Sequence, residues 1–343
     1  MADFQSRKPR LDAPYAVGVD LGGQNVRAAV MRRGDREPKT VSLPSDAKEG
    51  ADRVRARVVE VVQKAMGSAG VTLDQVAGVG VAVAGHIDPV TGVIHWSPNF
   101  GHMEGSTFKM FLEEPFTEPV GAALGLPVYA ANDANAAVLG EWKHIGKANV
   151  TDIVMFTLGT GIGGGVVSGG RLLTGSTGGA VEIGHHVIVA GGRKCGCGTL
   201  GCLEAYCGTD AILERALRMM ERNLESSLWH RIEEDKTNFK PIIISEEAIK
   251  GDATAQAVWE ETGYYLGIGM GNAVNLFNPQ YVILGGQIRN ATGLLAAAER
   301  SMRRHLVYSI GRTCSVIPAE LGDHAGVVGG AELVWEAVDA ARS

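Results

Sequence analysis

The chain has 343 residues with a net charge of −6, and 45% of its residues are hydrophobic against 20% charged. This length allows two domains with separate cores, and the acidic balance argues against a protein that binds nucleic acid mainly through phosphates. No apolar run is long enough to span a membrane, and the polar N-terminus lacks the apolar segment of a secretory signal. Three of the five cysteines lie close together, which favours a reducing cytoplasm over dispersed disulfides.

The chain begins with a tail, residues 1–14, that we expect to be disordered, and continues into a predicted hairpin. Two apolar runs within residues 15–31 flank a turn at Gly22 and Gly23, and Asp20 ends the first run. Such a turn can present backbone N–H groups to a phosphate, with Asp20 near the associated Mg²⁺, although a plain hairpin explains the same residues. Periodicity then predicts a helix over 51–69, a strand over 76–84, a hairpin within 85–100 that turns at 88–92, a helix over 116–124 and a strand over 128–131.

A polar pair, Asn132 and Asp133, follows the last of these strands and opens a helix predicted over 134–142. Ligand chemistry in open α/β sheets concentrates at the carboxyl ends of strands, which makes this pair a candidate site. The alternative is that one of the two side chains only caps the helix.

A second glycine turn follows in the other half of the chain. A strand over 152–158 runs into Gly159-Thr160-Gly161-Ile162-Gly163-Gly164-Gly165 and then a strand at 166–167, again a hairpin suited to holding phosphate. It is not the dinucleotide-binding fingerprint, because no long helix follows, and it lacks the Gly-Lys-Ser/Thr of a Walker A loop. A third glycine-lined turn, Gly285-Gly286, ends a strand that begins at 281.

The remaining periodicity predicts helices over 209–228, 245–250, 253–277, 294–305 and 325–341 and a strand over 315–318. In the first of these helices, one apolar face contains Ile212, Leu213, Leu217 and Met220. In the longest, small residues that would allow close helix packing stand at Gly263, Gly267, Gly269 and Gly271. The hairpins near Gly22 and Gly161 look like one element used twice, which predicts an internal duplication with a cleft between two α/β halves.

Four candidate metal ligands lie close together in the second half: His185, Cys195, Cys197 and Cys202. Three thiolates and an imidazole form a tetrahedral zinc set, and the glycines among them let the backbone fold sharply around an ion. Four protein ligands leave no open position, so we interpret the metal as structural, and the alternative is a set of small buried cysteines. Glu182 and Glu204 flank the cluster, and a bound metal would fix both carboxylates. Cys207 and Cys314 are interpreted as ordinary buried thiols.

The sequence resembles the ROK family of sugar kinases, within the actin-like ATPase fold. The matching segments follow the family order over nearly the whole chain: Asp20-Leu-Gly-Gly-Gln-Asn-Val-Arg, Asn132-Asp-Ala-Asn, Leu158-Gly-Thr-Gly-Ile-Gly-Gly-Gly, Glu182-Ile-Gly-His and Cys195-Gly-Cys-Gly-x-x-Gly-Cys-x-Glu. The last two together are highly specific. The chain departs from the family at Gln24, where Thr is usual, and at residues 85–88, where Gly-His-Ile-Asp replaces the commoner Gly-Pro-Val-Asp.

The resemblance implies duplicated actin-like ATPase (ribonuclease H-like) domains with a cleft between them. The small N-terminal α/β domain would comprise residues 15–131 and the returning C-terminal helix, 319–343. The large α/β domain would comprise residues 132–318 and carry the zinc-binding loop.

The resemblance also implies a role for each matching residue. Asp133 would be the catalytic base. The sugar hydroxyls would bind to Asn132, Asp133, Glu182, His185 and Glu204, with one ring nitrogen of His185 on zinc and the other on the sugar. The phosphates of ATP would be bound by Gly22, Gly23, Gln24, Gly159, Thr160, Gly161 and Gly163. Asp20 would act near Mg²⁺, and Gly285 and Gly286 would lie by the adenosine.

The implied activity is ATP-dependent phosphorylation of a hexose at its 6-hydroxyl, with glucose as the first expectation. N-acetylglucosamine, N-acetylmannosamine, mannose, fructose and allose are alternative substrates, and a non-catalytic sugar-binding regulator is an alternative function. A sugar-responsive repressor would need a longer DNA-binding segment than the fourteen residues before Tyr15. We therefore expect a cytoplasmic homodimer or homotetramer that uses ATP, Mg²⁺ and a structural Zn²⁺, with no nucleic acid or membrane partner.

Overall fold

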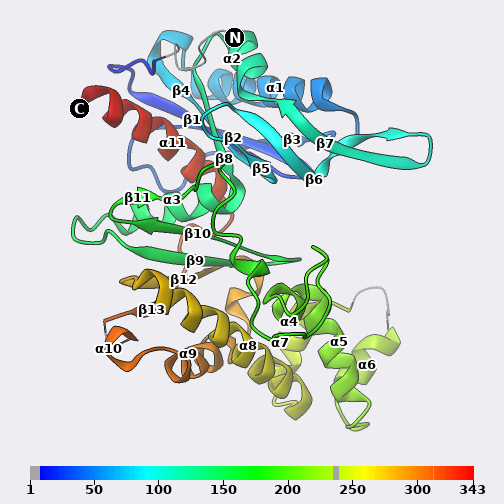
Figure 1. Ribbon diagram of the computed structural model, residues 1–343. Helices are drawn as coiled ribbons and strands as arrows, with labels where there is room; N and C mark the ends of the chain where they lie inside the picture. The colour runs from blue at the N-terminus through cyan, green and yellow to red at the C-terminus, as the bar shows by residue number, and fades with distance from the viewer. Residues whose placement is uncertain (1–7, 235–238, 312) are drawn as a thin grey trace. The chain divides into compact units, whose positions relative to one another are not determined.

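The computed structural model describes residues 8–234, 239–311 and 313–343 (Figure 1), so residues 1–7 of the expected tail lie outside the described residues. The chain forms two compact units. Among the described residues, the first comprises 8–149, 172–181 and 320–343, and the second comprises those within 150–171 and 182–319. Each unit is built on its own five-stranded sheet.

The sheet of the first unit has the strand order β3-β2-β1-β4-β8. The strands are β1 (Tyr15–Leu21), β2 (Asn25–Met31), β3 (Val41–Pro44), β4 (Val76–Val83) and β8 (Val128–Asn132). β1 pairs antiparallel with β2 and parallel with β4, and β4 pairs parallel with β8. The hairpin predicted at residues 15–31 is therefore confirmed.

Alternation along β1 assigns the two faces of this sheet to different helices. Val17 and Val19 share a core cluster with the buried valines of α1 (Ala51–Ala69), a helix whose bounds match the predicted range. Between them, Gly18 faces α11 (Ala325–Arg342), where an added Cβ would overlap the carbonyl oxygen of Val327. Gly80 of β4 meets α11 in the same way at Gly330. Glycine at both positions lets α11 approach the backbone of the sheet.

The rest of the first unit consists of α2 (Thr117–Leu124), α3 (Asp133–Ile145), the short turns η2 (Leu73–Gln75) and η6 (Gly322–His324), and a small sheet of β5 (His86–Ile87), β6 (Val93–Glu104) and β7 (Thr107–Pro115). The predicted hairpin ended at residue 100, whereas the β6–β7 hairpin continues to Pro115. Trp96, Met110 and Leu112 are exposed on this hairpin, so its sequence lacks the apolar–polar alternation by which a half-buried strand is recognised.

The boundary between the units differs from the predicted one, because α3 belongs to the first unit. Its Gly140 lies so near α11 that an added Cβ would be 3.0 Å from the backbone nitrogen of Gly329. In the structure the boundary therefore lies between residues 149 and 150, and not between residues 131 and 132. The described part of the expected tail is also ordered, since the N–H of Arg10 donates to the carbonyl of Ala77 at 3.1 Å.

The sheet of the second unit repeats this topology, with the order β11-β10-β9-β12-β13. The strands are β9 (Ile153–Leu158), β10 (Ile162–Ser168), β11 (Arg171–Leu172), β12 (Tyr281–Gly285) and β13 (Ser315–Pro318). β9 pairs antiparallel with β10 and parallel with β12, and β12 pairs parallel with β13. The predicted duplication is present in the strand order. The glycine turn is shorter than expected, because β10 already begins at Ile162.

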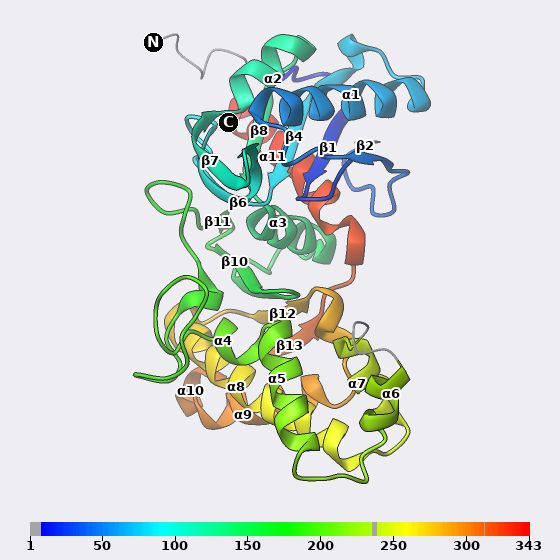
Figure 2. The same cartoon turned by 90° about the vertical axis from the view of Figure 1, so that its right-hand side faces the viewer.

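The helices of the second unit lie beside one another below its sheet in Figures 1 and 2. α8 (Ala253–Phe277) packs on α9 (Leu294–Arg304), and a Cβ at Gly263 would lie 2.5 Å from that of Ala297, as the small residues predicted. The other elements are η3 (Ile183–His185), α4 (Glu204–Cys207), α5 (Thr209–Met220), α6 (Leu228–Glu234), α7 (Pro241–Ile249), η5 (Gln287–Asn290) and α10 (Tyr308–Gly311).

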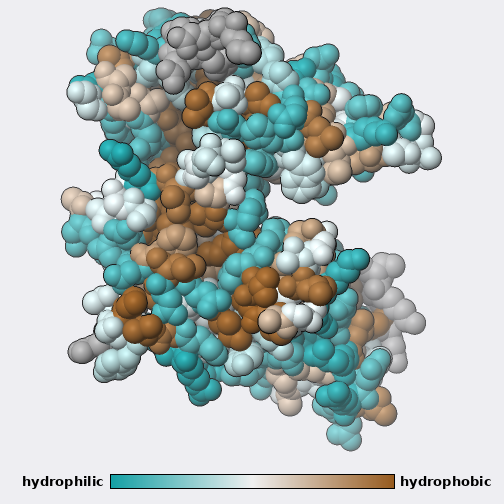
Figure 3. Space-filling view, viewed as in Figure 1, coloured by the Kyte–Doolittle hydropathy of each residue, from teal (hydrophilic) through white to brown (hydrophobic). Residues whose placement is uncertain are grey.

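The helix predicted over 209–228 is wrong in its second half, because α5 ends at Met220. Leu217, expected on its apolar face, is 42% exposed. No helix among the described residues has both the length and the apolar composition that a membrane crossing needs. On the face viewed in Figure 3, apolar residues form patches among hydrophilic ones.

Candidate functional site

The first glycine turn joins β1 to β2 and leaves two backbone donors unused. The N–H of Gly22 donates to the carbonyl of Asn25 at 3.0 Å, and the carbonyl of Gln24 accepts from the N–H of Ser45 at 3.0 Å. The N–H groups of Gly23 and Gln24 donate to no described residue. Two adjacent free donors at the tip of a hairpin are the arrangement that binds an anion.

Asp20, at the end of β1, is paired with a cation of the same hairpin. Its Oδ2 accepts from Nη2 of Arg27 at 2.7 Å. Burial nevertheless raises the pKa of Asp20, because the loss of solvation outweighs the charge of Arg27. Gly326 lets the start of α11 approach, since an added Cβ there would lie 2.8 Å from the carboxyl carbon of Asp20. The carboxylate expected near Mg²⁺ is thus held by an arginine in this structure.

The polar pair after β8 divides into a cap and an exposed carboxylate. Oδ1 of Asn132 accepts from the N–H groups of Ala134 and Asn135 at 2.9 and 3.3 Å, and its Nδ2 donates to the carbonyl of Gly85 at 3.1 Å. Asn132 therefore caps α3, as one of the two sequence interpretations predicted. Asp133 is exposed in the first turn, where its Oδ1 accepts from the N–H of Ala134 at 2.8 Å.

The second glycine turn, Gly159 to Gly161, is anchored to the start of α5. The carbonyl of Gly159 accepts from Oγ1 of Thr209 at 2.9 Å, and the carbonyl of Thr160 accepts from its N–H at 3.2 Å. The N–H groups of Thr160 and Gly161 donate to no described residue. Sequence reasoning missed Thr209, although a hydroxyl residue after a glycine at a predicted helix start was a visible signal.

Glu204, the first residue of α4, lies between this turn and the cysteine cluster. Its Oε2 accepts from the N–H of Ile162 at 3.0 Å, so the backbone donor that follows the turn is occupied. Its Oε1 lies 3.7 Å from Sγ of Cys195 and 4.0 Å from Nδ1 of His185. A Cβ added at Gly161 would overlap Oε2 of Glu204. One carboxylate therefore contacts both sequence motifs.

Two glycines place η3 directly on β10. An added Cβ at Gly184 would overlap the carbonyl of Ile162, and one at Gly164 would overlap the side chain of Ile183. His185 is half-buried and its N–H donates to the carbonyl of Glu182 at 2.9 Å. The carboxylate of Glu182 is exposed and has no hydrogen bond to a described residue.

The predicted metal ligands come together. The ligand atoms of His185, Cys195, Cys197 and Cys202 all lie within 4.8 Å of one another. Nδ1 of His185 is 3.6 Å from Sγ of Cys195, and the sulfurs of Cys197 and Cys202 are 3.7 Å apart. A tetrahedral zinc site with Zn–S bonds of about 2.3 Å has S···S edges of about 3.8 Å and S···N edges of about 3.5 Å. These two edges fit that geometry, and the 3.7 Å between the sulfurs of Cys197 and Cys202 is far longer than the roughly 2.05 Å of a disulfide.

The thiols of this cluster have unequal proton affinities. Burial raises the pKa of Cys202 to about 12 and also raises the pKa of Cys195. The backbone N–H of Thr199 lowers the pKa of Cys197 to about 7. Because zinc binds thiolates, metal binding here would release protons from the two buried thiols.

The third glycine turn has a packing explanation. Gly286 has a φ of +81°, and an added Cβ would overlap the backbone of Leu158 in β9. A Cβ at Gly285 would overlap the side chain of Met155. Both glycines are therefore required by the contact between β12 and β9.

The fold and the site define a class: two α/β units with one strand order, each with a glycine turn that has free N–H donors. This is the duplicated actin-like ATPase fold expected from the sequence. Residues 16–337 match the model of the ROK family, and the chain belongs to that family.

The relatives include kinases and regulators. The glucokinase of Thermotoga maritima is 32% identical over 324 residues, which cover 94% of this chain and 98% of that protein. A ROK family glucokinase from Streptomyces griseus, solved with glucose and AMPPNP, is 30% identical with a TM-score of 0.76 and covers 94% of this chain and 99% of that one. The DNA-binding transcriptional dual regulator NagC of Escherichia coli is 30% identical, but the match covers 78% of this chain and only 62% of NagC.

Proposed function

We propose that this protein is a glucokinase that transfers the γ-phosphoryl group of ATP to the 6-hydroxyl of glucose. The observation that carries the proposal is the nearly full-length similarity to glucokinases, of which one was solved with glucose and an ATP analogue. The free N–H donors of both glycine turns support ATP as the second substrate, because they suit a polyphosphate.

Asp133 is proposed as the catalytic base. A sugar hydroxyl is a poor nucleophile, so a carboxylate must accept its proton as it attacks the γ-phosphorus in line. Asp133 suits this role because it is an exposed carboxylate at the carboxyl end of β8. Asn132 holds the start of α3, and since only one N–H of its Nδ2 donates to Gly85, the second is left for a sugar hydroxyl.

Glu182, His185 and Glu204 are proposed to bind the remaining hydroxyls of the sugar. Carboxylates pair well with vicinal hydroxyls, and a site built on such bonds rejects analogues that lack them. The exposed carboxylate of Glu182 supports its assignment. His185 directs Nδ1 toward the cysteine cluster, which leaves Nε2 as the nitrogen for the sugar.

The phosphates of ATP are proposed to bind through backbone groups at Gly22, Gly23, Gln24, Gly159, Thr160, Gly161 and Gly163. Backbone binding is compatible with Gln24 in place of the usual Thr, because the N–H does not depend on the side chain. Asp20 would act near Mg²⁺, which would supply positive charge to the phosphates, and Arg27 would then share or leave this carboxylate. Gly285 and Gly286 are proposed to lie by the adenosine.

A structural Zn²⁺ is proposed to be held by His185, Cys195, Cys197 and Cys202. The support is that the four ligand atoms lie within 4.8 Å of one another and that one S···N and one S···S separation, 3.6 and 3.7 Å, match a tetrahedral site. Zn²⁺ would supply only cross-linking here, since all four positions are taken by protein atoms. It would fix His185 and, through the short segment to α4, Glu204.

A cytoplasmic location and a homodimeric or homotetrameric state complete the proposal. Three thiolates that hold a metal need a reducing compartment to escape oxidation. Light scattering after size-exclusion chromatography measures the subunit number directly.

A coupled ADP-release assay on purified protein tests the proposed activity. It compares glucose with mannose, fructose, allose, N-acetylglucosamine and N-acetylmannosamine, with a no-sugar reaction as control. We expect the highest kcat/KM for glucose. ADP release with glucose that does not exceed the no-sugar rate would overturn the proposal, and a higher kcat/KM for another sugar would reassign the substrate.

A further inference from the structure

Thr209 binds two successive carbonyl groups of the second glycine turn. Its Oγ1 donates to the carbonyl of Gly159 at 2.9 Å. Its backbone N–H lies 3.2 Å from the carbonyl oxygen of Thr160 and 3.3 Å from that of Gly159. The motifs of the sequence do not include this threonine, and it lies outside the residues proposed to contact substrate.

These bonds fix the direction of the donors on the opposite side of the turn. In a trans peptide unit the C=O and the N–H point in opposite directions. The peptide that joins Gly159 to Thr160 directs its carbonyl to Thr209, so the N–H of Thr160 points away from α5. The peptide that joins Thr160 to Gly161 directs its carbonyl to the N–H of Thr209, so the N–H of Gly161 also points away from α5. These are the two donors that no described residue uses.

The N–H of Gly159, the third in the turn, and the N–H of Ile162, which follows the turn, are both occupied. The carbonyl of Gly161 accepts from the N–H of Gly159 at 3.0 Å, and the N–H of Ile162 donates to Glu204 at 3.0 Å. The turn therefore presents two free donors, and both owe their direction to Thr209.

The element that carries Thr209 is firmly held. Arg215 of α5, whose side chain is 1% exposed, donates to the carbonyl of Tyr206 and to Oγ1 of Thr262 in α8, each at 2.8 Å. An added Cβ at Gly208 would lie 3.0 Å from the carbonyl of Thr160, so the start of α5 is in close contact with the turn. A position held this way can act as a template for the turn.

We propose that Thr209 is a positioning residue that orients the N–H groups of Thr160 and Gly161 toward the phosphates of ATP. The inference rests on the proposed function for the identity of the ligand, but not on the sugar that is phosphorylated. Thr209 itself touches no phosphate. Its hydroxyl acts through the carbonyl of Gly159, and its backbone N–H acts through the carbonyl of Thr160.

Two variants separate this role from a general structural one. Thr209→Val keeps the shape and the backbone N–H but removes the hydroxyl, and Thr209→Ser keeps the hydroxyl. Calorimetry measures the affinity of each for Mg²⁺·AMPPNP and, separately, for glucose. We expect Thr209→Val to weaken AMPPNP binding about 3- to 10-fold, the effect of one hydrogen bond. Thr209→Ser should bind AMPPNP like the wild type, and glucose affinity should not change in either.

Unchanged AMPPNP affinity in Thr209→Val would overturn the proposal, as would a parallel loss of glucose affinity or a failure of Thr209→Ser to restore binding. A wild-type protein that binds no AMPPNP would overturn it as well. A wild type that binds AMPPNP, shows the expected pattern in both variants and yet phosphorylates no glucose would contradict the proposed function alone.

Discussion

A glycine can be required by a ligand or by a neighbouring side chain, and Gly161 shows the difference at the scale of one residue. The sequence assigns it to a phosphate turn. In the structure, an added Cβ would meet the carboxylate of Glu204, which binds the N–H of Ile162. Gly159 differs, because its added Cβ would have only the carbonyl of Gly161 nearby, at 4.0 Å. Glycine at position 161 is therefore required by a neighbouring side chain, whereas no neighbouring side chain requires glycine at position 159.

We predict that Gly161→Ala weakens glucose binding about 10-fold and also raises the KM for ATP, because the new methyl displaces a carboxylate proposed to bind sugar. Gly159→Ala is the matched control and should leave glucose affinity within about twofold of the wild type, since nothing is displaced. Calorimetry with glucose and steady-state kinetics with ATP decide the point. A loss confined to ATP in Gly161→Ala would show that Glu204 does not bind sugar.

At the scale of elements, the segment of residues 182–204, from the start of η3 to the start of α4, carries the four proposed metal ligands and three of the proposed sugar ligands, Glu182, His185 and Glu204. Its ligand types could be predicted from the sequence, because three cysteines in eight residues rarely have another use. The sequence marked Thr209 only as a hydroxyl residue at a predicted helix start, and its bonds to the glycine turn could not be predicted, since they depend on which carbonyls lie against the start of α5.

We predict that Cys197→Ser lowers Tm by about 5 °C or more and weakens glucose binding, because binding energy at a structural zinc site is also folding energy. Cys197 is exposed, so the loss of packing is small. Cys314→Ser, a buried thiol outside the cluster, is the control and should keep its zinc. Elemental analysis of metal-replete wild type that finds less than about 0.2 zinc per chain would contradict this account.

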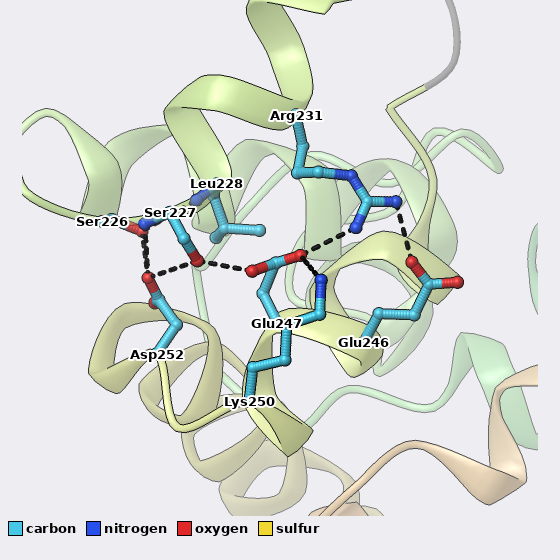
Figure 4. A network of polar contacts seen from close by, with 8 residues as sticks. All are labelled: Ser226, Ser227, Leu228, Arg231, Glu246, Glu247, Lys250 and Asp252. Carbon is cyan, nitrogen blue, oxygen red and sulfur yellow. Dashed lines mark hydrogen bonds and ion pairs between the residues drawn. The ribbon is translucent and has the colours of Figure 1, made fainter.

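A polar network joins α6, α7 and the start of α8 (Figure 4). Glu247, with a side chain only 4% exposed, accepts from Ser227, Arg231 and Lys250 at 2.6 to 2.8 Å. Burial alone would raise the pKa of Glu247, but the hydrogen bonds from Lys250, Ser227 and Arg231 lower it to about 2. The folded-state pKa is below the ordinary value of 4.5, so the stability from Glu247 is present above pH 4.5 and is lost as the pH falls toward 2.

We predict that Glu247→Gln lowers the free energy of unfolding by about 1–3 kcal/mol at pH 7. Glu246→Gln, which removes the exposed partner of the same arginine, should cost less than about 1 kcal/mol. Urea unfolding between pH 7 and pH 3 measures both. The difference between Glu247→Gln and the wild type should shrink below pH 4.5, and a difference that stays constant to pH 3 would contradict the assignment.

At the scale of the whole molecule, the duplication was visible in the sequence because both hairpins carry glycine turns between apolar runs. The boundary between the two units was not visible in the sequence. It depends on the contact of α3 with α11, which follows about 190 residues later in the chain. Long-range contact of this kind leaves no local pattern. Gly140 and Gly329, which permit it, are ordinary glycines in the sequence.

The turnover of Asp133→Asn tests the central claim most directly. The account predicts a loss of at least about 100-fold in kcat at saturating ATP and glucose, because a general base contributes roughly 10²–10⁴. Glucose affinity by calorimetry should survive, since the amide can still hydrogen-bond a hydroxyl. If the variant keeps more than about a tenth of the wild-type turnover, its loss is smaller than the low end of that range. This result would place the base elsewhere.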